Sequence, residues 1–180
     1  MAVINYQERD SEKIRPLIFV FFFNRERMIE VIERALRNGL DYFYIVVFDF
    51  PISFEIKQRL NLADDLPLLI PTSHLFHRRD SHSILPEQIY AILGKALNNP
   101  EAIFYDIAAM NYRFYVRMNE KVYRIVFQFS VTADYDVGQQ GNVLVTLFQD
   151  HKSPKKTVLD AKNKPDGRLV FVYWNEEGWA

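Results

Sequence analysis

The spacing of hydrophobic residues changes twice along the first third of the chain. Residues 17–23 form a continuous apolar run, which is typical of a strand buried on both faces. The next segment has apolar residues three and four positions apart, and it lies between Asn24, a suitable helix N-cap, and Gly39, a suitable helix terminator. A second apolar run at 42–50 predicts another buried strand. This order predicts a strand-helix-strand element of its own.

A further helix is predicted in the middle of the chain, after a short helix at 54–60 and an irregular, proline-containing connection at 64–73. Its apolar stripe consists of Leu85, Ile89, Ile92, Leu93, Ala96 and Leu97. Pro86 suits the first turn of this helix, whereas Leu85 has no side-chain acceptor and is a poor N-cap. The sequence Asn98-Asn99-Pro100 ends it.

From residue 102 onward the apolar period changes to two or to continuous runs, which predicts strands at Ile103–Tyr105, Tyr112–Met118, Val122–Phe129, Asn142–Phe148 and Leu169–Trp174. Asn119-Glu120 predicts a tight antiparallel hairpin, because asparagine tolerates positive φ. We expect a meander, with a long lysine-rich loop at 150–167. The predicted fold is α+β: an antiparallel sheet packed against one or two helices, with the strand-helix-strand element at 1–62 and the main domain at 63–180.

Composition indicates a well-packed globule with little net charge. Of 180 residues, 49% are hydrophobic and 15% aromatic, and the formal net charge is −1. From His74 onward there are thirteen Lys and Arg against twelve Asp and Glu. Because this basic excess is small for a dedicated nucleic-acid-binding domain, any RNA contact must depend on a local patch.

The sequence also limits the chemistry and the compartment. It has no cysteine, which excludes disulfides and thiolate metal sites and fits the cytoplasm or, as the alternative, a secreted toxin module. The apolar run at 17–23 is too short to span a bilayer, so we expect a protein that does not enter membranes. Gly-rich phosphate loops and G-x-S-x-G elbows are absent from the sequence, which argues against nucleotide-triphosphate enzymes and hydrolases of those kinds.

Reactive side chains are densest at residues 72–82, which hold His74, His77, His82 and two arginines just before the middle helix. Imidazole both accepts and donates a proton near neutral pH, and arginine binds phosphate, so acid-base work on a phosphodiester is one interpretation. A zinc site with Asp80 as a further ligand is a second interpretation. The third is a solvated polar loop without catalytic function.

A second candidate surface lies on the predicted hairpin. Strand alternation places Arg113, Tyr115 and Arg117 on one face, and Lys121 and Arg124 lie just across the turn. Two cations beside an aromatic ring are suited to holding a phosphate and stacking a base. The alternative is the solvated outer face of a half-buried sheet.

The order of these segments resembles a known superfamily. A histidine-bearing segment ending in His82 is followed by LPEQIYAILGKALNNPEAIFYD, then YRFYVRMNEKVYRIVFQFS, then GNVLVTLFQ. Over residues 56–150 this is similar to the phage-associated nucleases of the barnase, EndoU, colicin and RelE-like (BECR) fold, many of which are toxin-like. The resemblance implies metal-independent cleavage of RNA through a 2′,3′-cyclic phosphate, with no cofactor and no metal.

Carried over by position, the resemblance assigns four catalytic residues: His82 as base or acid, Arg117 and Arg124 as cations on the phosphate, and Thr146 as a hydrogen-bond donor. The surrounding candidates for substrate binding are His77, Arg113, Tyr115 and Lys121. RNA is the expected partner, and an inhibitor or immunity protein is a further hypothesis. Two other functions stay open: a non-catalytic interaction module of the same fold on a phage or mobile-element protein, and a metal-dependent hydrolase that uses the histidine cluster.

Overall fold

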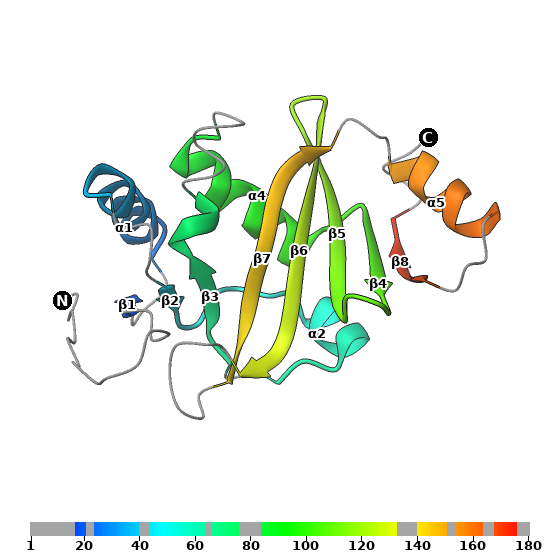
Figure 1. Cartoon of the computed structure of the whole chain (residues 1–180), viewed down its shortest axis with the longest axis horizontal. Coiled ribbons are helices and arrows are strands. Elements are labelled where there is room, and N and C mark those ends of the chain that lie inside the picture. Colours follow the sequence, from blue (N-terminus) through cyan, green and yellow to red (C-terminus); the bar gives the residue numbers. More distant parts are fainter. Residues whose placement is uncertain are drawn as a thin grey trace.

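The computed structural model describes residues 17–20, 24–39, 44–63, 66–75, 84–132, 140–150, 154–163 and 168–175. The strands are β1 (Leu17–Val20), β2 (Tyr44–Val47), β3 (Leu68–Pro71), β4 (Ala102–Asp106), β5 (Asn111–Met118), β6 (Lys121–Thr132), β7 (Gln140–Asp150) and β8 (Leu169–Trp174). The main helices are α1 (Arg25–Arg37), α2 (Phe54–Leu60), α4 (Pro86–Asn98) and α5 (Pro154–Asn163). They form one eight-stranded mixed sheet in the order β1-β2-β3-β7-β6-β5-β4-β8, with helices packed against it, which confirms the α+β prediction (Figure 1).

The centre of the sheet is the antiparallel series β4 to β7. Each of these strands pairs with the next one along the chain, so this part is the predicted meander. β5 and β6 are joined by Asn119 and Glu120, whose φ angles of 49° and 63° fit a tight hairpin turn with two left-handed residues. The expected hairpin at these two residues is confirmed.

The N-terminal strand-helix-strand element is confirmed as well. β1 and β2 are parallel, and α1 connects them. The side chain of Asn24 accepts a hydrogen bond from the Arg27 N–H at 2.9 Å, and Gly39 has a φ of 65° after the helix. β2 then pairs with β3, and β3 pairs with β7, so the sheet runs without a break across the predicted boundary between 1–62 and 63–180.

Two predictions of irregular structure were wrong. β3 forms within 64–73, because Pro71 stands at the end of the strand and leaves the interior N–H groups of this buried run to pair with both neighbours. α5 forms within 150–167, where Pro154 takes the first helical position and the buried Val158 packs against the sheet. Lysine is a good helix former, so the lysine-rich composition that suggested a loop also allows a helix once one face has a surface to cover.

β8 also departs from the expected meander, because it pairs with β4 rather than with β7. It therefore stands at the end of the sheet order, opposite to β1. None of the helices in the described part of the chain has both the length and the hydrophobicity needed to cross a membrane.

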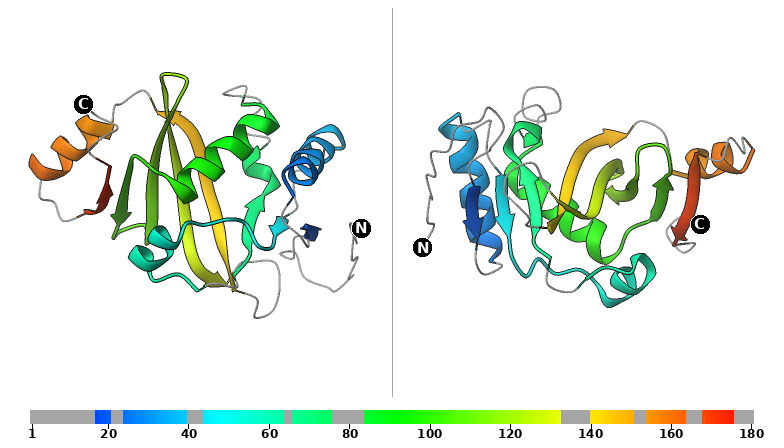
Figure 2. Two further views of the ribbon diagram at one scale, coloured as in Figure 1. Left: turned by 180° about the vertical axis from the view of Figure 1, so that it is seen from behind. Right: turned by 60° about the horizontal axis from the view of Figure 1, so that its bottom comes forward.

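The two faces of the sheet differ. α4 lies behind β5, β6 and β7 in Figure 1, and the view from behind in Figure 2 shows it crossing them. We call this side the covered face, and its interior is made by Ile89, Ile92, Leu93, Ala96, Leu97, Ile103, Phe114, Val116, Ile125 and Phe127, all buried. We call the opposite side the open face. There Val158 of α5 packs with Phe104 of β4 and Tyr115 of β5, so α5 covers the side of the open face that is next to β8.

Candidate functional site

Strand pairing brings three of the four predicted catalytic residues onto the open face. Arg117 lies opposite Val122, two residues before Arg124 on β6, and Thr146 lies opposite Val126, two residues after it. Directly opposed residues share a face of the sheet, so Arg117 and Thr146 are each a diagonal neighbour of Arg124, about 7–8 Å away between backbones. Arg124 is therefore the centre of this group.

The guanidinium of Arg124 is held by two residues of β7. Its Cζ lies 4.2 Å from the centroid of the Phe148 ring, and its Nε lies 3.6 Å from Oδ2 of Asp150. The second distance is an ion-pair contact that is too long for a hydrogen bond. Nε is buried and has no hydrogen-bond partner in the described structure, although 29% of the side chain is exposed. A buried donor left without an acceptor is costly, and the neighbours of this guanidinium do not fully satisfy it.

α4 fixes the strand that carries Arg117. Nζ of Lys95, near the end of the helix, donates to the carbonyl oxygen of Arg117 at 2.6 Å and to Oε1 of Glu101 at 3.1 Å. These contacts join the helix to the end of β5 from the covered side. The backbone of Arg117 is thus anchored while its side chain belongs to the opposite face.

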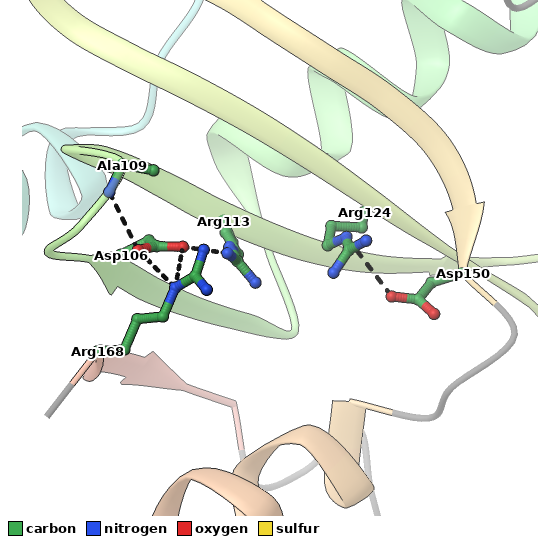
Figure 3. A network of polar contacts seen from close by, with 6 residues as sticks. All are labelled: Asp106, Ala109, Arg113, Arg124, Asp150 and Arg168. Carbon is green, nitrogen blue, oxygen red and sulfur yellow. Dashed lines mark hydrogen bonds and ion pairs between the residues drawn. The ribbon is translucent and has the colours of Figure 1, made fainter. Parts of the chain in front are cut away.

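A second group of charges on the open face surrounds Asp106, a fully buried carboxylate at the end of β4. It accepts hydrogen bonds from the Arg113 guanidinium, from Nε of Arg168 at 3.3 Å to each oxygen, and from the Ala109 N–H at 3.2 Å (Figure 3). Burial raises the pKa of Asp106, but the hydrogen bonds from Arg168 and Ala109 and the charges of the two arginines outweigh it, so the pKa is lowered overall. Asp106 is thus an ionised carboxylate that holds two arginines in place.

Tyr115 is the clearest correction at the predicted site. Its side chain is 1% exposed and meets Phe104 edge to face, with ring centroids 5.9 Å apart. The prediction that this tyrosine stands on a solvated face, ready to stack a base, is therefore wrong. The reason is tertiary: Val158, on a helix the sequence did not predict, covers this end of the open face.

Of the other substrate-binding candidates on the hairpin, Arg113 lies opposite Val126 and is therefore also a diagonal neighbour of Arg124, whereas Lys121 is not brought together with it. Arg113 shares the open face but donates to Asp106, and only 20% of its side chain is exposed. Lys121 lies opposite Met118, so its side chain belongs to the other face of the hairpin. Arg113 and Lys121 stay predictions as substrate ligands.

Of the histidine segment at residues 72–82, only residues 72–75 are described. Nδ1 of His74 lies 3.2 Å from the carbonyl oxygen of Leu144, and His74 lines a small cavity with Ile89 of α4. After the segment, Ile84 belongs to the core on the covered face. His74 and Ile84 are thus on the helix side of the sheet, whereas Arg117 and Arg124 are on the open side. His77 and His82 lie outside the described residues.

Metal binding receives no support from the part of the chain that the structure describes. Within those ranges there is no group of three His, Asp or Glu side chains able to hold an ion. The predicted zinc alternative depends on His77, Asp80 and His82, which are outside these ranges.

Sequence reasoning missed Phe148 and Asp150 as neighbours of the site. A signal for them was present, because Thr146, Phe148 and Asp150 are two residues apart and so share a face of one strand. The alternation along β7 alone does not show that this face also carries Arg124 of β6.

No family model, no curated protein and no solved structure matches this chain. The likeness to the BECR nucleases thus depends on the sequence pattern alone.

Proposed function

We propose that this protein is a metal-independent endoribonuclease whose phosphate-binding surface is the open face of β5, β6 and β7. One observation carries the proposal: Arg117 and Thr146 are diagonal neighbours of Arg124, whose buried Nε has no hydrogen-bond partner in the described structure. Two cations and a hydroxyl donor along one face of the sheet are suited to a phosphodiester, whose charge grows as a nucleophile attacks. The same proposal includes RNA as the binding partner and the cytoplasm as the compartment.

The chemistry needs no metal. A base removes the proton of the ribose 2′-hydroxyl, the 2′-oxygen forms a bond to the adjacent phosphorus, and the bond from phosphorus to the 5′-oxygen breaks as an acid protonates that oxygen. The products are a 2′,3′-cyclic phosphate and a 5′-hydroxyl. In this scheme Arg124 and Arg117 neutralise the developing charge, Thr146 donates to a phosphate oxygen, and His82 is the base or acid.

The test is cleavage of labelled single-stranded RNA by the purified chain in excess EDTA, with chemical analysis of the product ends. We expect cyclic-phosphate ends and a loss of about 100-fold in rate in Arg124→Gln, as when one preorganised donor to the developing charge is removed. Arg37→Gln is the matched control, because Arg37 is exposed at the end of α1, far along the sheet order from the site. His82→Ala is expected to abolish cleavage.

Either of two results would reject the nuclease proposal: RNA that stays intact with the unaltered protein, or cleavage that Arg124→Gln leaves unchanged. Metal-dependent cleavage that EDTA stops would instead support the hydrolase that uses the histidine cluster.

A non-catalytic interaction module is the second candidate, and one observation favours it. The open-face cations are matched by carboxylates: Arg113 and Arg168 share Asp106, and Arg124 lies beside Asp150. Paired cations of this kind build a structural surface without requiring a substrate. Intact RNA in the assay above, together with a folded protein, would select this function.

A further inference from the structure

A cleft of about 470 Å³ lies at the β8 end of the sheet, and neither Arg117 nor Arg124 lines it. Four consecutive strand residues line it, from Phe171 to Trp174. Successive side chains of a strand point to opposite faces, so a cleft that meets all four passes along an edge of the strand. β4 occupies one edge of β8, and β8 ends the sheet order, so the cleft follows the other edge.

Two helices wall this cleft, on opposite sides of the strand. Arg59 of α2 stacks on the ring of Tyr173, with its Cζ 4.9 Å from the ring centroid. On the other side α5 contributes Val158 and Leu159. Figure 2 shows α5 beside β8 at this end of the sheet.

The lining combines hydrophobic side chains with two cations. Leu159 and Phe171 are 50% and 51% exposed, which is high for large hydrophobic side chains that line the same cleft. The two charged lining residues are Arg59 and Lys155, both cations. Arg59 also pairs with Glu55 on its own helix, at 2.9 Å, and this contact leaves the ring stack in place.

We propose that this cleft binds an extended acidic peptide segment of a partner protein, which adds as a strand along the outer edge of β8. Backbone pairing at a sheet edge supplies affinity, and the apolar walls select alternate side chains of the bound segment. The contact spans four strand residues, about 13 Å. Arg59 and Lys155 favour carboxylates at the ends of that segment.

The residues that line the cleft favour a peptide over a second copy of this chain. A second copy would bring its own Arg59 and Lys155 to the same edge together with its β8, so like charges would meet across the contact. An extended acidic segment brings no such cations. Arg117, Arg124 and Thr146 do not line this cleft. The peptide proposal therefore does not depend on the nuclease proposal.

The test uses a phage-displayed library of random peptides about twelve residues long, roughly twice a usual strand, selected on the full chain. Enriched sequences are expected to alternate apolar and polar positions and to carry Asp or Glu. The best one, synthesised with a fluorescent label, is then titrated by anisotropy against the unaltered chain, Leu159→Lys and Leu85→Lys. Leu85 is the matched control, because it is 58% exposed and does not line the cleft.

We expect Leu159→Lys to weaken binding at least about tenfold and Leu85→Lys to leave it unchanged. Bound peptide should also slow amide hydrogen exchange in residues 171–174, the part of β8 that lines the cleft. Lys155→Glu should weaken binding of the acidic peptide. Lys121→Glu should leave that binding unchanged, because Lys121 is exposed and lies outside the cleft.

Three results would overturn the proposal. The first is a selection that yields no peptide whose binding depends on Leu159. The second is a labelled RNA oligonucleotide whose binding Leu159→Lys abolishes, which would assign the cleft to nucleic acid. The third is dimerisation of the chain that the same substitution prevents.

Discussion

The covered and open faces are built from the same strands, yet alternate side chains give them opposite characters. On the covered face, Phe114 and Phe127 are completely buried and meet edge to face, with centroids 5.2 Å apart. On the open face, one residue before Phe114, Arg113 donates to a buried carboxylate. One strand thus serves a hydrophobic core and a charged surface at once.

The difference teaches where stability and function separate in this molecule. Apolar burial on the covered face is non-directional and additive over many side chains, so it stabilises the fold without specifying any ligand. The charges on the open face contribute little net stability once their desolvation is included. In the proposed function, their placement around Arg124 is what would let that face recognise an anion.

The largest expected effect comes from the covered face. Phe114→Ala should lower the free energy of unfolding by about 4 kcal/mol, because it removes a buried ring and leaves a cavity. Urea denaturation followed by circular dichroism measures this change. Phe171→Ala is the control, since that ring is 51% exposed, and it should lose clearly less. Equal losses in the two variants would mean that the faces do not differ in their contribution to stability.

Asp106 is the exception on the open face, and its removal should come next in size. Asp106→Ala leaves Arg113 and Arg168 without their shared carboxylate, and we expect a loss of about 3 kcal/mol in the free energy of unfolding. Asp160→Ala, at an exposed position on α5, should change it by less than about 0.5 kcal/mol. A small loss for Asp106→Ala in the same urea experiment would show that this network does not anchor β8.

The pH dependence of stability should report the same carboxylate. Because the pKa of Asp106 is lower in the folded protein than its ordinary value of 3.8, its contribution is complete above that pH and is lost as the pH falls through the lowered value. Asp106→Asn should therefore lose less stability on acidification than the unaltered protein does. Parallel curves of the free energy of unfolding against pH would contradict this assignment.

The smallest effect is expected in the turn between β5 and β6, outside both faces of the sheet. Glu120 has a φ of 63°, which strains a residue with a side chain, so Glu120→Gly should raise the free energy of unfolding by about 0.5–1 kcal/mol. Glu120→Ala keeps the strain and is the control. A destabilised glycine variant would show that Glu120 contributes by its side chain rather than through its backbone.

Local patterns were enough for most elements of the fold. The short helix at 54–60, the stripe of α4 and the strands from 102 to 148 follow from periodicity and turn chemistry over neighbouring residues. β3 and α5 did not follow, because prolines and lysines at those positions are also compatible with loops. Each forms because a surface distant in sequence is available to it: β7 for the first, and Phe104 with Tyr115 for the second.

The strand register shows which residues selected from the sequence share a face, and it adds neighbours that the sequence did not indicate. Arg117, Arg124 and Thr146 were singled out from sequence, and the strand register places them on one face. The same register added Phe148 and Asp150, and α5 removed Tyr115 from solvent.

By itself, the sequence determined the type of most elements and which side chains of each strand point the same way, because these depend on contacts between near neighbours along the chain. Only the tertiary structure decided which side chains of different strands meet on the same face of the sheet. Arg168 reaches Asp106 across 62 residues, and Arg124 meets Asp150 on the next strand. Such partners are selected by strand register and by burial, which are properties of the whole packed sheet and not of any segment within it.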